Sequence, residues 1–380
     1  MKIAILIRRY LTTGGAERYA VEVARRLAVR HEVHIFAQEF DHVPQGMTAH
    51  QVPKRFAKPN FANQWWFSWW TARNVRGFDV VYTHERATRF DVMHIHSGTF
   101  VGGLLGKSPD ERKNRFHVLV KLLTQPRVAA YWLLEKLHYR PLPGRRWIAV
   151  SDMIKREVQS FYPIPDDRFH IAHPGTDLPD NPVELARSRK FGRNFLNVAD
   201  NEVLLIFVGS EFKRKGLEAL INALALLKNK LVKLVILGGG DRSAFEKQAA
   251  RLNLGDRILW AGLVKNTGDY YAAADIFVLP TLSDAGPMSP VEAMAHGCPA
   301  IFSCADYAGM AEMVRHDEAI LLKNPRNEDE IAAAIGKLLN PALRQEYADK
   351  GRVLAGQLSW DRTAGLVIQA LEHAAQHRWE

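Results

Sequence analysis

The sequence predicts an α/β protein built from two doubly wound, Rossmann-like domains that face each other across a cleft. Two observations support this prediction. Short apolar segments of strand length alternate with amphipathic segments of helix length along nearly the whole chain of 380 residues, a pattern typical of parallel sheets covered by helices. The alternation also starts afresh after residues 172–182, AHPGTDLPDNP, whose proline, glycine and aspartate residues indicate a linker.

We expect five buried strands in the first half of the chain and six in the second, because each of these segments is a short, mostly apolar run. The first series is KIAILI (2–7), EVHIFA (32–37), FDVVYTH (78–84), FDVMHIHS (90–97) and RWIAVS (146–151). The second series is EVLLIFVGS (202–210), VKLVILGGG (232–240), DRILWAG (256–262), ADIFVLPT (274–281), CPAIFS (298–303) and EAILL (318–322).

These series place a first domain at residues 1–172 and a second domain at 173–355. No strand is expected in the last segment, residues 356–380, so we expect a C-terminal helix there that packs back on the first domain.

Basic residues are concentrated in the first domain. Residues 1–172 contain 27 Lys and Arg against 15 Asp and Glu, a net charge of +12, whereas residues 173–380 contain 24 against 26, a net charge of −2. A basic half joined to a near-neutral half indicates that the first domain meets an anionic partner, which could be a membrane, a nucleic acid or a phosphorylated glycan.

The remaining composition points to a cytoplasmic protein. No apolar run reaches the roughly 18–20 residues needed to span a bilayer, and the apolar run at the N-terminus is too short for the core of a signal peptide. The sequence contains only two cysteines, Cys298 and Cys304, which favours a reducing compartment and argues against a disulfide framework.

Two loops that follow strands and open helices are candidate anion sites. Gly14 and Gly15, in TTGGAER, would let the backbone approach a ligand closely at a helix N-terminus. A tight turn that binds nothing would use the same glycines. In VGSEFKRKG, residues 208–216, the basic triplet at 213–215 stands where a phosphate would receive charge-assisted hydrogen bonds, although such residues are commonly only solvated.

A third loop contains two carboxylates at a suggestive spacing. Within residues 274–302 a strand ends at a proline, the loop that follows places Asp284, and Gly286-Pro287 leads into a helix that carries Glu292. A carboxylate on a loop and another eight positions later on a helix can face one ligand, and sugar hydroxyl groups are suitable partners for both. The alternative is a capping aspartate and a surface glutamate.

These elements together resemble the family-4 glycosyltransferases, which are retaining enzymes of the GT-B fold. The resemblance runs from GGAER through VGSEFKRKG and ADIFVLPT to VEAMAHGCPAIF and the closing LSW segment, so it covers most of the chain. Within the family, the chain looks most similar to the lipopolysaccharide inner-core glucosyltransferases, which use UDP-glucose to extend a heptose. The GSEFKRKG block and the overall length support this narrower resemblance.

The resemblance implies that the first domain binds the acceptor and the second domain binds the nucleotide sugar. It implies that the pair matching Arg214-Lys215 neutralises the departing diphosphate, and that Glu292 holds the ribose while Asp284 addresses the donor sugar. The implied donor site comprises Gly14, Gly15, Arg214, Lys215, Asp284, Gly286, Pro287, Met288 and Glu292.

The chain departs from the family pattern in this loop. The first carboxylate is an aspartate where the family has a glutamate, and Pro287 stands where a glycine is expected, with Gly286 one place early. These departures bear on the identity of the donor sugar and leave the diphosphate site unaffected.

The family also implies a histidine that faces the donor sugar at the end of a first-domain strand. His96, last before a Ser-Gly turn, is our choice, and with Asp284 and Lys215 it completes the expected catalytic set. His94 has the same strand parity and His84 ends the neighbouring strand, and any of the three could instead be a core histidine.

No metal or other cofactor is expected, because the family is metal-independent and because fixed cations and helix ends can stabilise a leaving phosphate. Retention without an evident nucleophile favours substitution on the front face, in which the leaving phosphate takes the proton of the acceptor.

The sequence therefore predicts a retaining hexosyltransferase that moves a sugar, with glucose favoured, from a UDP-sugar to a membrane-borne glycan such as the lipopolysaccharide core, on the inner face of the cell membrane. Three alternatives stay open. One is a family-4 enzyme with another donor or acceptor, such as a polysaccharide or glycolipid synthase. Another is an epimerase or phosphorylase of the same layout. The third is a non-enzymatic nucleic-acid-binding protein, which the basic half and clustered aromatics would suit, although we expect no nucleic acid as partner.

The segment WWFSWW, residues 65–70, contains four of the nine tryptophans of the chain, Trp65, Trp66, Trp69 and Trp70. Their spacing is helical, and the lysines and arginines on either side are typical of an anchor at the interface of an anionic membrane. We therefore expect a face that contacts the membrane and the acceptor, extended by residues 116–140. Burial in the core of the domain is the alternative.

Overall fold

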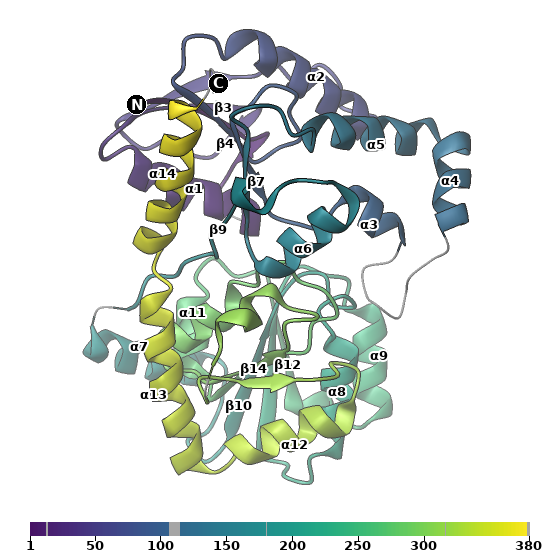
Figure 1. Ribbon diagram of the computed structural model, residues 1–380. Helices are drawn as coiled ribbons and strands as arrows, with labels where there is room; N and C mark the ends of the chain where they lie inside the picture. Colours follow the sequence, from purple (N-terminus) through teal and green to yellow (C-terminus); the bar gives the residue numbers. More distant parts are fainter. Residues whose placement is uncertain (13, 106–114, 180, 316, 378–380) are drawn as a thin grey trace. The chain divides into compact units, whose positions relative to one another are not determined.

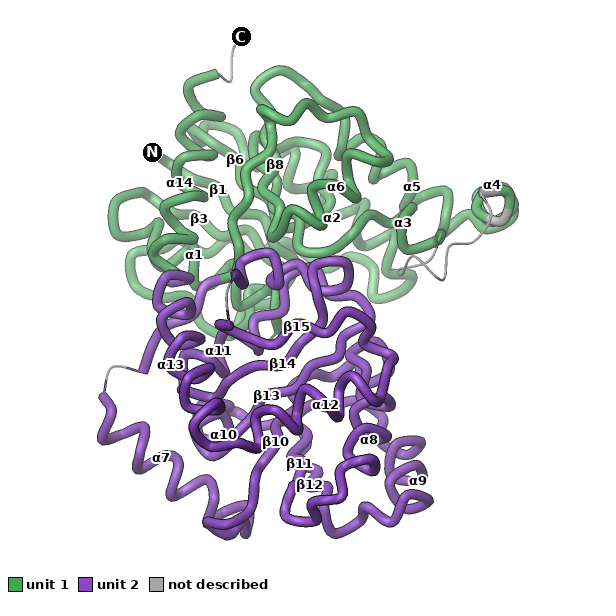
Figure 2. The backbone as a smooth tube through the Cα atoms, turned by 60° about the horizontal axis from the view of Figure 1, so that its bottom comes forward, with its two compact units in different colours: residues 1–174, 360–380 green, residues 175–359 purple. Residues whose placement is uncertain are grey.

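The computed structural model describes residues 1–12, 14–105, 115–179, 181–315 and 317–377. The chain divides into two compact units, drawn in green and purple in Figure 2. Unit 1 consists of residues 1–174 and 360–380, and unit 2 of residues 175–359. The first boundary between them, at residues 174 and 175, lies within the linker expected at residues 172–182.

Unit 1 is built on a seven-stranded sheet in which every neighbouring pair is parallel. The order across the sheet is β5-β3-β1-β6-β7-β8-β9, so the chain winds outward in one direction from β1 and then in the other. This is the order of a doubly wound fold. The strands are β1 (Lys2–Leu6), β3 (Glu32–Ala37), β5 (Met47–Gln51), β6 (Val80–Thr83), β7 (Val92–Ile95), β8 (Arg146–Ala149) and β9 (Phe169–Ile171).

The five strands expected in this half are present, and the sequence analysis missed two more. β5, MTAHQ, is an edge strand whose side chains are exposed or half-buried, so it has no apolar run to reveal it. β9 is only three residues long. A separate parallel pair, β2 (Arg9–Tyr10) and β4 (Glu39–Phe40), was not expected either.

The helices of unit 1 follow its strands, as a parallel sheet requires. They are α1 (Gly15–Leu27), α2 (Asn60–Asn74), α3 (Phe100–Leu105), α4 (Arg115–Thr124), α5 (Pro126–His138), α6 (Asp152–Phe161) and α14 (Trp360–Gln376), with a 3-10 turn, η2, at Asp166–Arg168 (Figure 1).

The C-terminal helix α14 packs on α1. Arg26 Nε of α1 lies 2.5 Å from Asp361 Oδ1 of α14. The Thr363 hydroxyl donates a 2.8 Å hydrogen bond to the carbonyl of His173. The buried ring of Trp360 meets Tyr19 edge-on, with the two centroids 5.3 Å apart. The last helix is therefore part of the core of unit 1, although the chain of unit 2 precedes it.

Unit 2 repeats the same winding in a six-stranded parallel sheet of order β12-β11-β10-β13-β14-β15. All six strands expected in the second half are present, and the order is again that of a doubly wound fold. The strands are β10 (Val203–Val208), β11 (Val232–Leu237), β12 (Ile258–Gly262), β13 (Ile276–Leu279), β14 (Ala300–Ser303) and β15 (Ile320–Leu322).

Helices and 3-10 turns alternate with these strands. The helices are α7 (Pro182–Phe195), α8 (Leu217–Leu226), α9 (Ser243–Arg251), α10 (Gly268–Ala273), α11 (Ser289–Ala295), α12 (Glu328–Leu338) and α13 (Pro341–Gln357), and the 3-10 turns are η3 (Gly255–Arg257) and η4 (Gly309–Met313).

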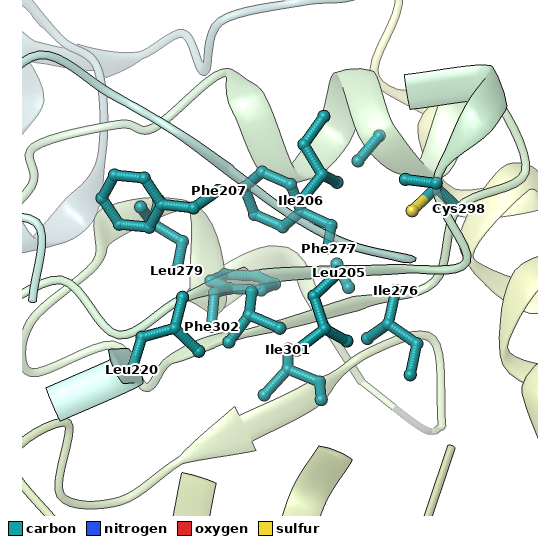
Figure 3. Packing of buried hydrophobic residues seen from close by; sticks show 14 of the residues in the cluster. Leu205, Ile206, Phe207, Leu220, Ile276, Phe277, Leu279, Cys298, Ile301 and Phe302 are labelled. Carbon is teal, nitrogen blue, oxygen red and sulfur yellow. The ribbon is translucent and has the colours of Figure 1, made fainter. Parts of the chain in front are cut away.

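The core of unit 2 lies around its central strands. Figure 3 shows side chains of β10, β13 and β14 packed together with Leu220 of α8 and with Cys298. The inner residues of these strands are buried whichever face of the sheet they point to, which explains why the sequence reads as continuous apolar runs and not as an alternating pattern. In the part of the chain that the structure describes, no helix is both long and apolar enough to cross a membrane.

Gly216 allows the close approach of two loops in unit 2. It has φ +77°, and a Cβ atom at this position would lie 1.9 Å from the carbonyl oxygen of Pro280. Neither the left-handed backbone nor the contact tolerates a side chain.

We predict that Gly216→Ala lowers the free energy of unfolding of unit 2 by about 3 kcal/mol, because it adds backbone strain to a steric overlap. The matched control is Gly336→Ala within α12, where a Cβ meets nothing within 4 Å; it should raise the free energy of unfolding by roughly 0.5–1 kcal/mol. Urea unfolding followed by circular dichroism measures both, and equal stabilities for the two variants would contradict the prediction.

Candidate functional site

The strand order of unit 2 reverses between β10 and β13, which lie side by side in the sheet. Ligands of doubly wound proteins bind outside the carboxyl ends of the strands at such a switch point. Two of the loops selected from the sequence start there: residues 209–216 follow β10, and residues 280–288 follow β13. The fold thus places the basic triplet and the first carboxylate at one edge of one sheet.

The loop after β10 is anchored by a buried aromatic residue. Phe212 is 4% exposed, and its ring centroid lies 6.2 Å from that of Phe207 and 5.7 Å from that of Phe245. Lys213 is exposed, whereas Arg214 and Lys215 are half-buried. The three basic residues therefore do not form one solvent-exposed patch, because the last two are half-buried.

Lys215 and Asp284 form an ion pair between Nζ and Oδ2, and their side chains are only 14% and 13% exposed. The backbone around Asp284 is fixed too. Its N–H donates to the backbone carbonyl of Tyr307 at 2.7 Å, and its carbonyl accepts from Gly309 N–H at 2.9 Å. Two residues selected independently from the sequence are thus in direct contact, 69 positions apart in the chain.

Arg214 makes further links between the two loops. Its Nη1 donates to the carbonyl of Ser283, its own carbonyl accepts from Leu282 N–H at 2.8 Å, and its Nε donates to Glu211 at 2.8 Å. Arg214 and Lys215 thus lie at the carboxyl edge of the sheet, and we call this pair of basic side chains the cationic corner. Glu211 and Asp284 balance their positive charges.

Glu292 occupies the first turn of α11 and is only 9% exposed. Tyr271 of α10 donates its hydroxyl to Glu292 Oε2 at 3.0 Å, and His296 Nδ1 lies 2.7 Å from the carbonyl of Glu292. Glu292 is therefore not a solvated surface residue, and its carboxylate is held in place by a buried tyrosine.

Residues 286–288, which lie between the two carboxylates, form the entry to α11. Gly286 is half-buried, Pro287 is buried, and Met288 is the residue that precedes the first turn of the helix.

The glycine pair of unit 1 lies at the start of α1, after β1. Gly14 is the residue before the helix and has φ +98°, a conformation that requires glycine, and Gly15 is the first helical residue. Both glycines are exposed, so the backbone at this helix N-terminus is open to a ligand. The adjacent Glu17 is paired with Arg9, with Oε1 and Nη2 2.5 Å apart.

The three candidate histidines of unit 1 form one cluster at the ends of β6 and β7. His84 Nδ1 and His96 Nε2 share a hydrogen bond of 2.7 Å, and the Tyr82 hydroxyl and His94 Nδ1 share another of 2.7 Å. His94 is 1% exposed and lies under Tyr19, with ring centroids 4.3 Å apart. His84 and His96 are half-buried.

Burial keeps these imidazoles neutral. It lowers the pKa of His96 to about 3, and burial together with the neighbouring imidazoles lowers the pKa of His84 and of His94 well below the usual value. Each ring therefore has one donor and one acceptor nitrogen at physiological pH. The Nε2 atoms of His84 and His94 are buried without a hydrogen-bond partner among the described residues.

The cluster also has the composition of a metal site. One ligand nitrogen from each of the three histidines lies within 4.8 Å of the other two, and neutral imidazole is a common ligand of Zn²⁺. An ion bound through His84 Nδ1 or His96 Nε2 would have to replace the hydrogen bond between them.

Sequence reasoning identified these residues but missed several of the side chains that hold them. Tyr271, Tyr82 and Tyr19 each contact a candidate residue from a different element. A single apolar-looking tyrosine in a strand or helix gives no sign of such a contact. One feature of the sequence points weakly to the pairing of His84 with His96: each residue lies at the end of a predicted strand, and the two strands are consecutive in the chain.

The tryptophan segment forms α2, and the inward face of this helix is mostly polar, with Phe67 as its buried apolar residue. Asn63, Gln64, Ser68 and Thr71 are at most 4% exposed. Asn63 and Gln38 exchange hydrogen bonds of 2.9 and 3.0 Å through their amides. The tryptophans are therefore displaced toward the sides and the outside of the helix.

The four indoles are not equivalent. Trp69 is 46% exposed, whereas Trp65, Trp66 and Trp70 are half-buried. Trp65 Nε1 donates to the carbonyl of Ala130 at 3.2 Å, and Trp66 Nε1 donates to that of Pro53 at 2.7 Å. Of the four tryptophans expected to form the membrane face, Trp69 is therefore the one that is well exposed.

Basic side chains cover three indole rings of unit 1. Arg55 lies 5.1 Å from the Trp66 ring centroid, Arg73 lies 3.8 Å from that of Trp69, and on α5 Lys136 lies 4.3 Å from that of Trp132. Within 116–140, α4 and α5 carry further exposed apolar side chains: Phe116, Leu119, Val120, Leu123, Leu133 and Leu137.

Comparison with known proteins agrees with this architecture. The family model described as Glycosyltransferase Family 4 matches residues 13–179, and the one described as Glycosyl transferases group 1 matches residues 188–353. An uncharacterized glycosyltransferase of Methanocaldococcus jannaschii is 30% identical over 323 residues, which cover 80% of this chain and 77% of that protein. The lipopolysaccharide glucosyltransferase WaaG of Escherichia coli is 23% identical over 361 residues, 93% of each chain.

Solved structures show the same fold at lower identity. The crystal structure of WaaG superposes with a TM-score of 0.82 at 21% identity and covers 97% of this chain and 99% of that chain. Anabaena HepE in complex with UDP-glucose superposes with a TM-score of 0.73 at 18% identity, covering 98% and 99%. With two parallel α/β units and matches to both family models, this chain belongs to the family-4 glycosyltransferases of the GT-B fold.

Proposed function

We propose that this glycosyltransferase moves a hexose, with glucose favoured, from a UDP-sugar to a membrane-associated glycan such as the lipopolysaccharide core, with retention of anomeric configuration and without a metal ion. The observation that supports this most is the cationic corner of Arg214 and Lys215, held against Asp284 at the switch point of unit 2. WaaG, a lipopolysaccharide glucosyltransferase, and HepE, solved with UDP-glucose, are among the proteins to which the chain is similar.

The ion pair suggests how the donor is received. A diphosphate carries more negative charge than a carboxylate, so its arrival would draw Lys215 Nζ away from Asp284 and toward the phosphate oxygens. Asp284, no longer paired, would then accept a hydrogen bond from a hydroxyl group of the donor sugar. We assign Glu292, held by Tyr271, to the ribose, and the loop at residues 286–288 to the same donor.

We propose that transfer occurs on one face of the donor sugar. The bond between the anomeric carbon and the diphosphate oxygen breaks while the acceptor oxygen bonds to the same face, and the leaving phosphate takes the acceptor's proton. Arg214 and Lys215 would stabilise the charge on the departing diphosphate, as fixed cations do in other transferases. His96, neutral because burial lowers its pKa to about 3, would contact the donor sugar as a hydrogen-bonding group and not as a cation. Gly14 and Gly15 would approach the diphosphate through their backbone.

We further propose that unit 1 binds the acceptor and rests on the inner, anionic face of the cell membrane through the basic and aromatic surface around Trp69. Indole rings covered by arginine or lysine combine apolar area with positive charge, which suits the interface of an anionic bilayer.

The donor assignment is tested by product analysis with a panel of UDP-, GDP- and ADP-sugars and truncated lipopolysaccharide cores. We expect UDP-glucose to be the best donor, the new linkage to keep the donor's anomeric configuration in the NMR spectrum, and EDTA to leave the rate unchanged. A GDP- or ADP-sugar that turns over while UDP-glucose is inert would refute the donor, and a loss of activity in EDTA that added metal restores would refute metal independence.

Lys215→Ala should lower the rate of transfer at least about 100-fold, because a fixed cation at the leaving diphosphate is worth roughly 3 kcal/mol, and should weaken UDP binding in calorimetry. The matched control is Lys213→Ala, in the same loop but exposed, which should behave like the wild type. A folded Lys215→Ala variant with near-normal turnover would remove the diphosphate role.

Trp69→Ser should weaken binding to vesicles that contain phosphatidylglycerol by about fivefold, since a half-exposed indole contributes roughly 1 kcal/mol when it enters the interface. UDP affinity should not change. Val29→Ser, which removes a side chain 79% exposed elsewhere in unit 1, serves as control in co-sedimentation. Equal sedimentation of both variants and wild type would exclude Trp69 as an anchor.

A further inference from the structure

A concave site lies within unit 1, and none of the residues that line it is assigned to the donor. This pocket has a volume of about 540 Å³, within the range that holds small organic ligands, about 300–1,000 Å³. It is formed by the segment before α2 and by α2, α3, α4 and α5.

One wall of the pocket is apolar and largely aromatic. The ring centroid of Tyr131 lies 5.3 Å from that of Phe100 and 6.4 Å from that of Phe61, and Leu104 and Val128 complete the surface. These side chains come from three helices, so the wall depends on the packing of α2, α3 and α5 and not on one helix alone.

Three basic side chains line the same pocket: Lys58 before α2, Lys121 on α4 and Arg127 on α5. No aspartate or glutamate among the described residues lines it. Among the residues that the structure describes, none of these three cations takes part in an ion pair. The described part of the chain therefore supplies no ion-pair partner for these three charges.

This combination selects one chemical class of ligand. A free, uncharged sugar could hydrogen-bond to the polar side chains of the lining, but it would leave the positive charges of Lys58, Lys121 and Arg127 without a counter-charge. An uncharged lipid would likewise leave the three cations without a counter-charge. An anionic amphiphile satisfies both halves, since a phosphate can pair with lysine and arginine while hydrocarbon covers the aromatic wall.

We propose that this pocket binds a single phosphate-bearing membrane lipid, with the phosphate between Lys58, Lys121 and Arg127 and the start of an acyl chain against Phe61, Phe100 and Tyr131. That the lipid comes from the membrane rests on the proposed function. That the pocket takes an anionic amphiphile rests on its lining residues alone.

The test uses dihexanoyl phosphatidic acid below its critical micelle concentration, titrated into the full-length protein by calorimetry. Dihexanoyl phosphatidylcholine has the same chains with a zwitterionic headgroup, and inorganic phosphate has the anion without chains. We expect phosphatidic acid to bind at least tenfold more tightly than either.

Two variants locate the binding. Lys121→Gln combined with Arg127→Gln should weaken phosphatidic acid at least tenfold, and Leu104→Trp, which fills the cavity, should do the same without changing a charge. Lys247→Gln removes an exposed lysine of α9 that does not line the pocket and should have no effect.

Equal affinity for the two lipids, equal affinity for inorganic phosphate, or unchanged binding by both pocket variants would overturn the proposal. Calorimetry with UDP runs beside it on each variant. Normal UDP binding with lost lipid binding supports the pocket, and failure of UDP binding in the wild type would count against the donor site alone.

Discussion

Because every strand in the two large sheets is parallel to its neighbours, each connection must cross from the carboxyl end of one strand to the start of another. Where the strand order reverses, the two crossings leave on opposite faces and their loops meet at one edge of the sheet. In unit 2 these loops follow β10 and β13, and the contact that joins them is the ion pair of Lys215 with Asp284. Gly216 permits it by bringing the backbone of one loop against Pro280 of the other.

Unit 1 uses the same winding with a different surface. Some of its buried polar groups pair with one another, as Asn63 does with Gln38, whereas the Nε2 atoms of His84 and His94 have no hydrogen-bond partner among the described residues. Apolar side chains that would otherwise fill the core are left at the outside of α2, α4 and α5, next to arginine and lysine. A basic, partly aromatic exterior on a well-packed sheet suits a unit that meets an anionic partner.

Much of the fold was predictable because parallel strands buried on both faces read as unbroken apolar runs. All eleven expected strands exist. The strands that escaped prediction are exposed or very short, as β5 and β9 show, and they contribute too little apolar surface to leave a pattern. Candidate residues such as Asp284 and His96 were identifiable from their place after a strand, whereas their partners could not be identified, since Tyr271 and Tyr82 look like ordinary core residues in sequence.

The sequence alone determined the two-unit α/β architecture, the uneven charge and the loops that contain the candidate residues, because periodicity and composition are local properties. Only the tertiary structure decided which side chains meet. It brought Lys215 to Asp284 across 69 positions, joined His84 to His96, and turned the polar face of α2 inward so that Trp69 alone of its four tryptophans is well exposed. These outcomes depend on the packing of segments distant in the chain, which no local pattern specifies.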